Sequence, residues 1–225
     1  MKPQEFVNEI TKSLRKHANA KEAEAMKRYL LNQFPFYGLK KPQRSLICKP
    51  LYAKLKGQID ETWILETAKL LWAKEEREYH TIAIDIFEKH KKLVTPKSFK
   101  TLEKMATTHS WWDSVDGISS CAIAPMVLKY PEMKKEMQRF SKDKNMWLNR
   151  ISIIYQILYK EKTDKEFLFK VCERHMHREE FFIRKAIGWA LRQYAKTNKK
   201  EVYAFVEKNK KKLSGLSYRE ALKHK

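Results

Sequence analysis

The segment Ser110–Asp116 holds the side chains that are best suited to chemistry. It reads Ser-Trp-Trp-Asp-Ser-Val-Asp, so two tryptophans and two aspartates are close together. If the segment opens a helix, Trp112 and Asp116 are one turn apart and share a face. An aromatic ring beside a carboxylate suits a substrate that carries or develops positive charge. The alternative is a packed tryptophan with an aspartate that favours the helix N-terminus.

Arginines accompany tryptophans in two other segments. Trp189 and Arg192 are three residues apart, so they lie on one helix face, and Arg150 closes the segment that begins at Trp147. In stacked helices, Arg150 and Arg192 would line one side and bind phosphates as planar, bidentate donors. The alternative is a pair of surface ion pairs, which contribute little to stability.

The sequence gives little support for a metal site or a nucleotide-binding site. His175 and His177 lie near Cys172, but residues two apart on a helix point to different faces, and no HExxH or CxxC pattern is present. The five glycines are isolated, so the glycine-rich loops of dinucleotide and P-loop sites are excluded. We expect no metal and no organic cofactor.

The composition indicates a helical protein with a polyanionic partner. The 225 residues include 48 Lys and Arg but 27 Asp and Glu, a formal net charge of +21. A hydrophobic content of 43% is enough for a core, and 5 Gly with 7 Pro favour helices over turn-rich β structure. Three distant cysteines indicate reduced thiols. With no signal peptide or membrane span in the sequence, we expect a soluble, cytoplasmic protein.

Apolar residues recur at helical spacing almost throughout the chain, which predicts an all-α fold. Trp112, Trp147 and Phe182 follow one another at intervals of 35 residues, the length of one helical pair. This period predicts a superhelical array of HEAT-like pairs in a single domain over residues 1–225; an irregular helical bundle is the alternative. Thr95-Pro96 predicts a helix start, and Thr163–Glu166 fits a capping box.

These motifs resemble the AlkD family of HEAT-like-repeat alkylpurine DNA glycosylases. The resemblance spans most of the chain, and SWWDSVD at 110–116 together with KAIGW at 185–189 is highly specific. It implies an all-α superhelix whose concave, basic face binds duplex DNA. It also implies hydrolysis of the N-glycosidic bond of cationic alkylated purines, chiefly 3-methyladenine and 7-methylguanine, by a monofunctional enzyme that leaves an abasic site.

The resemblance assigns roles residue by residue. The catalytic aspartate falls on Asp116, and the two active-site tryptophans fall on Trp112 and Trp189. The expected DNA contacts are Tyr29, Arg150, Lys185 and Arg192. We expect a monomer, because the groove must admit duplex DNA.

The chemistry of the residues agrees with this role. An alkylated purine is already cationic, so the barrier to its release lies in a sugar that becomes oxocarbenium-like and needs an anion nearby. Two other functions remain open. One is a non-catalytic, basic helical-repeat scaffold that binds DNA or RNA, and the other is a protein-binding solenoid, which would need an acidic partner.

Overall fold

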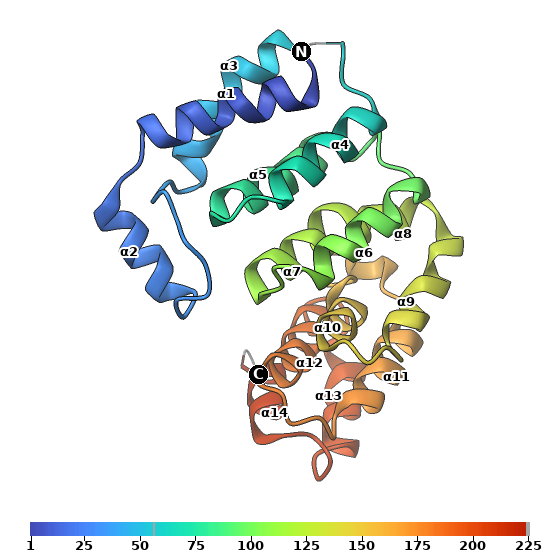
Figure 1. Cartoon of the computed structure of the whole chain (residues 1–225). Coiled ribbons are helices and arrows are strands. Elements are labelled where there is room, and N and C mark those ends of the chain that lie inside the picture. The colour runs from blue at the N-terminus through green and yellow to red at the C-terminus, as the bar shows by residue number, and fades with distance from the viewer. Residues whose placement is uncertain (56, 224–225) are drawn as a thin grey trace. The chain divides into compact units, whose positions relative to one another are not determined.

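The computed structural model describes residues 1–55 and 57–223 of the chain; residues 56, 224 and 225 lie outside the described residues. The described residues form helices and turns without any β-strand, so the predicted all-α class is confirmed (Figure 1). In these residues no helix is both long and apolar enough to span a bilayer. Contacts divide the chain into two compact units, Met1–Thr101 and Leu102–Lys225, which we describe one at a time.

The first unit has a packed core formed by four of the five helices in its described residues. Its helices are α1 (Pro3–Lys16), α2 (Ala20–Tyr29), α3 (Lys41–Lys54), α4 (Glu61–Trp72) and α5 (Arg77–Lys89). Helix α1 packs against α3 and α4, and α4 packs against α5 (Figure 1). Each of these helices except α2 turns a buried face toward the core, as amphipathic spacing predicts. The core residues include Phe6, Ile10, Leu14, Ile64, Leu71, Ile82 and Phe87.

Helix α6 (Phe99–Thr107) crosses the boundary between the two units. A short 3-10 turn over Pro96–Ser98 precedes it, and the Thr95 hydroxyl oxygen accepts the N–H of Lys97 at 3.3 Å. The helix start predicted at Thr95-Pro96 is therefore a 3-10 turn that leads directly into α6.

The second unit is organised around one long helix, α12 (Phe181–Ala195). Its other helices are α7 (Trp112–Ile118), α8 (Ala124–Lys129), α9 (Lys134–Phe140), α10 (Met146–Ile154), α11 (Lys165–His175), α13 (Lys199–Lys208) and α14 (Gly215–Ala221). Helix α12 packs against α10, α11, α13 and α14. Its buried face joins a core that includes Ile154, Leu168, Cys172, Ile183, Ile187, Leu191, Val202 and Val206.

The start of α11 differs from the prediction. Asp164 is the N-cap residue, and its carboxylate accepts the N–H of Phe167 at 3.1 Å. The capping box predicted from Thr163 is therefore wrong, because the aspartate one residue later binds the free N–H group of the first turn. The superhelical HEAT-like arrangement, its basic groove and the single domain over residues 1–225 remain predictions.

Candidate active site

Helix α7 carries the first two candidate residues. It begins at Trp112 and contains Asp116, so the prediction that this segment opens a helix is confirmed. Trp112 is half-buried, and the Asp116 side chain is 19% exposed. Asp113 lies in the first turn of the helix, where a carboxylate is favourable. A π-helical turn over Ser119–Ile123 follows the segment, and π turns are frequent at functional sites.

Asp116 forms a bidentate ion pair with Arg150 of α10. The Arg150 Nε donates to Oδ1 and its Nη2 donates to Oδ2, both at 2.7 Å. The third nitrogen, Nη1, donates to the backbone oxygen of Phe182 at 2.6 Å. The Arg150 side chain is only 6% exposed. Two parallel bonds of this kind fix the carboxylate in one orientation.

The surroundings of Asp116 act on its protonation in two opposite ways. Burial raises the pKa of the Asp116 carboxyl above its usual value, and the hydrogen bonds and positive charge of Arg150 act against that rise. Arg150 therefore favours the charged form of Asp116 against the effect of burial.

An aromatic cluster lies beside this ion pair. The rings of Trp111, Trp147 and Phe182 contact one another, with centroids 5.0 to 5.9 Å apart. The Arg150 guanidinium lies 5.9 Å from the centroid of the Phe182 ring. The cluster thus places an aromatic ring, that of Phe182, beside the bonded guanidinium, and a less polar environment strengthens the attraction between Arg150 and Asp116.

The 35-residue period marks these aromatic positions with one exception. Trp147 and Phe182 are each the second residue of their helix, α10 and α12. In the earlier segment, however, Trp111 joins the cluster, one residue before the Trp112 of the period. Sequence reasoning therefore missed Trp111 and the ring contacts of Phe182. Phe182 is itself a position of the period, and Trp111 is the neighbour of another, Trp112.

Helix α12 carries Lys185, Trp189 and Arg192. Trp189 is partly buried against the core of the second unit. Lys185 Nζ donates to Oε1 of Glu220 on α14 at 2.9 Å, and Arg192 Nη1 donates to Oε2 of the same carboxylate. These hydrogen bonds hold the pKa of Glu220 below its usual value. One acidic side chain thus binds both cations, and no sequence pattern singled out Glu220.

Gly188 allows α14 to approach α12 this closely. A Cβ added at Gly188 would lie 2.4 Å from Glu220 Cβ and 2.9 Å from the Ser217 backbone oxygen. The Ser217 hydroxyl also donates to the Arg184 backbone oxygen at 2.9 Å. The glycine of KAIGW therefore has a packing role that positions Glu220 near Lys185 and Arg192.

Three of the four expected DNA contacts are thus ion-paired within the chain. Arg150 binds Asp116, while Lys185 and Arg192 bind Glu220. Arg150 and Arg192 are ion-paired, as the alternative reading of the sequence allowed, but the Arg150 pair is buried and not at the surface. Their contacts with DNA, and that of Lys185, remain a prediction. The fourth, Tyr29, is the last residue of α2 in the first unit and is 71% exposed.

The histidines lie away from these side chains in the sequence and differ in burial. His175 ends α11 and is almost fully buried; burial is the main cause that lowers its pKa to about 4. Among the described residues, no group of three His, Cys, Asp or Glu side chains is placed to hold a metal ion.

Together, the helices and the Asp116–Arg150 pair define an all-helical protein with a partly buried, charged site beside an aromatic cluster. The chain belongs to the DNA alkylation repair enzyme family, whose model matches residues 10–224. The family supports an enzyme that acts in DNA alkylation repair.

Two solved structures are similar to this chain. A "Predicted DNA alkylation repair enzyme" from Enterococcus faecalis is 31% identical, with a TM-score of 0.85, over 92% of this chain and 96% of that chain. The smu.31 protein from Streptococcus mutans UA159 is 15% identical, with a TM-score of 0.61, over 88% of this chain and 98% of that chain, and supports the fold alone. None of the curated proteins matches the chain.

Proposed function

We propose that this protein is a monofunctional DNA glycosylase that hydrolyses the N-glycosidic bond of cationic alkylated purines in duplex DNA. The substrates we propose are 3-methyladenine and 7-methylguanine. The observation that carries the proposal is the carboxylate of Asp116, partly exposed and held at both oxygens by Arg150. Membership of a DNA alkylation repair family supplies the substrate context.

The protein has to contribute little to the departure of the alkylated purine. Alkylation gives the purine a positive charge, so the base departs with the electron pair of the glycosidic bond and becomes neutral. Positive charge then develops on the sugar, as in glycoside hydrolysis. Water adds its oxygen to C1′, and its second proton passes to solvent. The protein therefore has to stabilise a cationic sugar and position a water molecule.

Asp116 is suited to that task, and Arg150 is suited to hold it. A fixed carboxylate stabilises charge that develops nearby without reorganising during the reaction. With little exposure and all three nitrogens bonded, Arg150 is better placed to orient Asp116 than to reach a phosphate. We therefore assign Arg150 a positioning role, in place of the DNA contact that the resemblance implies.

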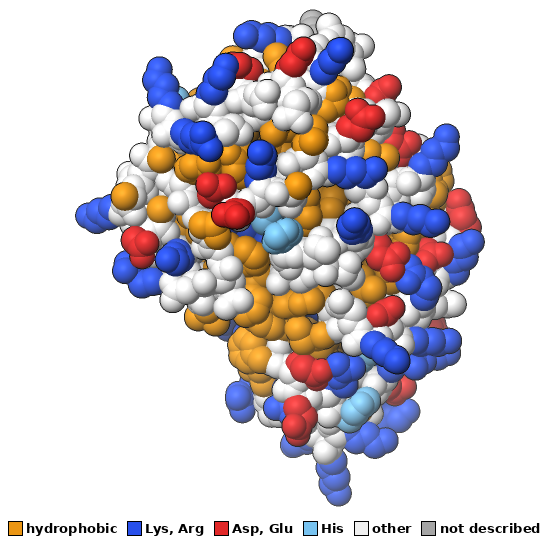
Figure 2. Space-filling model, in the orientation of Figure 1, with side chains coloured by type: hydrophobic (Ala, Val, Ile, Leu, Met, Phe, Trp, Pro, Cys, Tyr) orange, Lys and Arg blue, Asp and Glu red, His pale blue; other side chains and the backbone are white. Residues whose placement is uncertain are grey.

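Trp112 and Trp189 are the proposed partners of the cationic base. Their electron-rich faces attract a cation, and both side chains are partly exposed. Lys185 and Arg192 are proposed to bind DNA phosphates, which would replace the Glu220 carboxylate that binds them in the free protein. Tyr29 is proposed as a DNA contact of the first unit. Lysine and arginine side chains spread over the face shown in Figure 2 fit a polyanionic substrate.

The test measures released bases. Methylated duplex DNA is incubated with the protein and with Asp116→Asn, and free 7-methylguanine and 3-methyladenine are separated by chromatography. We expect release by the parent protein, and DNA binding without release by the variant. Asp113→Asn, which removes a carboxylate from the same helix, is the matched control and retains activity.

Two results would contradict the proposal at different points. Normal turnover by Asp116→Asn would remove Asp116 from the mechanism. DNA binding by the parent protein without any base release would favour the scaffold function instead.

A further inference from the structure

Helix α2 ends in two exposed side chains of low polarity. None of its residues is buried, and only Leu30, directly after the helix, reaches the core at 4% exposure. On either side of Leu30, Tyr29 is 71% exposed and Leu31 is 66% exposed. Figure 1 shows α2 at the edge of the first unit. The end of this helix thus presents an aromatic ring and a leucine to solvent.

Leu31 also has a backbone conformation that leucine rarely adopts. Its φ is +57°, in the left-handed region that costs free energy for residues with a Cβ. The hydrogen bonds are those of a Schellman motif: Leu31 N–H donates to the Arg28 oxygen at 2.9 Å, and Asn32 N–H donates to the Lys27 oxygen at 2.8 Å. Glycine is the usual residue at this position of the motif.

The segment after Leu31 is fixed to the body of the first unit. The buried carboxylate of Glu78 on α5 accepts the backbone N–H groups of Tyr37, Gly38 and Leu39 at 2.8 to 3.1 Å. Asn19 N–H, at the start of α2, donates to the Tyr37 oxygen at 2.8 Å. These bonds hold both ends of the helix–loop segment. The left-handed turn therefore lies within a segment that is held at both ends.

The free protein gains little stability from the Leu31 side chain. Its conformation is unfavourable, and an exposed leucine contributes little burial. Glycine would satisfy the same turn without strain. The leucine side chain is therefore best explained by a partner that covers it.

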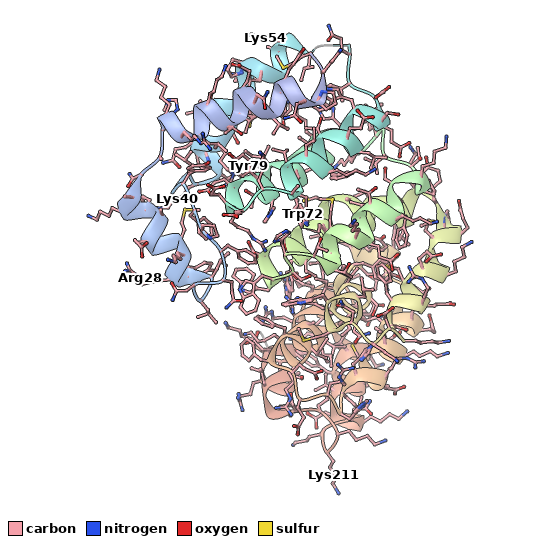
Figure 3. All side chains as sticks on the ribbon, in the orientation of Figure 1. Arg28, Lys40, Lys54, Trp72, Tyr79 and Lys211 are labelled. Carbon is pink, nitrogen blue, oxygen red and sulfur yellow. The ribbon has the colours of Figure 1, made fainter. Side chains whose placement is uncertain are left out.

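The charge around Leu31 indicates the chemistry of that partner. The last turn of α2 carries Lys27 and Arg28, directly before Tyr29, and the sequence from residue 25 to residue 59 contains no aspartate or glutamate. Figure 3 labels Arg28 and also Lys40 of the following loop, whose ammonium group is paired with the Glu22 carboxylate of α2 at 2.6 Å. A partner that matches this stretch must be anionic and must also offer an apolar surface. Duplex DNA has both, because the sugars that line its minor groove lie between its phosphates, and proteins insert leucines there.

We propose that Leu31 packs, with Tyr29, against the sugars of the minor groove of duplex DNA. The proposal rests on the proposed function, in which DNA is the substrate, and adds a contact residue that no motif singled out. Leu31 acts by apolar contact, and the neighbouring lysines and arginines act by charge.

The test compares stability and DNA affinity in Leu31→Gly. The variant removes the strain and the side chain together, so its thermal unfolding midpoint rises while its Kd for undamaged duplex DNA increases about fivefold. The dependence of Kd on salt concentration stays unchanged, because leucine releases no counterions. A purely structural residue would change affinity only by changing stability in the same direction.

Two further variants separate the side chain from the backbone. Leu31→Ala keeps the left-handed conformation of a residue with a Cβ and loses most of the side chain. It should bind DNA as weakly as Leu31→Gly, without the increase in stability. Leu158→Ala is the matched control, because Leu158 is 67% exposed in the second unit and is expected to bind DNA as the parent does.

The result that overturns the inference is parental DNA affinity in both Leu31 variants. A fall in stability together with affinity in Leu31→Gly would overturn it as well. The Leu31 test measures affinity for undamaged DNA and does not depend on base release. The Leu31 proposal and the glycosylase proposal can therefore fail independently of each other. A parent that binds DNA but releases no base contradicts the glycosylase proposal alone. A parent that does not bind DNA contradicts both.

Discussion

Removing Arg150 should make the stability of the protein depend on the charge of Asp116. Arg150→Ala deletes one partner of an ion pair in which the arginine is 6% exposed and the aspartate 19%. Breaking a buried pair by deleting one partner costs about 3 to 5 kcal/mol, since the other charge is left uncompensated. Because Asp116 keeps some exposure, we expect a loss of about 3 kcal/mol at neutral pH.

The loss should shrink as the pH falls. Burial already raises the pKa of Asp116, and the hydrogen bonds and charge of Arg150 lower it. Without Arg150, the pKa of Asp116 therefore rises further. In the variant, the folded state therefore takes up a proton at a higher pH than the unfolded chain does. The destabilisation is present while Asp116 is ionised and is lost as the pH falls through its raised folded pKa. The acidic limb of the base-release profile should move to higher pH for the same reason.

The assay is urea unfolding at neutral and at mildly acidic pH. Arg150→Ala/Asp116→Asn should recover most of the stability lost by the single variant, because no uncompensated charge remains. Arg139→Ala is the matched control. Arg139 binds Glu103 through two bonds at 2.7 and 2.8 Å, but at the surface, where an ion pair contributes about 1 kcal/mol or less. An equal loss at both pH values, or no recovery in the double variant, would refute the reasoning.

Two predictions concern α12. Replacing Lys185 or Arg192 by glutamine should weaken binding to every DNA sequence and reduce the salt slope by about one per residue; a slope equal to that of the parent would remove that residue from the phosphate contacts. Gly188→Ala should lower the free energy of unfolding by about 1 to 3 kcal/mol, because the new methyl group would meet Glu220 Cβ and the Ser217 backbone at 2.4 and 2.9 Å. Thermal unfolding measures this loss, and full parental stability would show that α14 shifts at no cost.

The all-α class and the placement of Trp112 and Asp116 on one helix could be predicted from the sequence. Both depend on short-range spacing: apolar residues repeat with the helical period, and Trp112 and Asp116 are one turn apart on α7. The 35-residue period also found the helix starts that carry Trp147 and Phe182. Local patterns of this kind predict the structure correctly because each of them concerns a single helix.

The partners of the site residues could not be predicted in the same way. Arg150 was expected at phosphates, but it donates all its bonds inward, to Asp116 and the Phe182 backbone. Glu220 lies 28 residues from Arg192, and only the packing of α14 on α12 brings them together. Such pairs depend on the distance between helices, which the period of a single helix does not contain. The misplaced cap at Thr163 has a smaller cause, since either of two adjacent residues could accept the same N–H groups.

The carboxylates that bind Arg150, Lys185 and Arg192 have a kinetic consequence for the proposed function. A phosphate that approaches α12 would have to exchange with Glu220, so contact there removes one anion as it adds another. The net charge of +21, most of it outside these pairs, would accelerate the first encounter with DNA and make its rate fall steeply with salt. The exchange itself would be a later and slower step, and its rate would depend less on salt. The protein could then move along undamaged duplex with its site residues still bound to their own carboxylates.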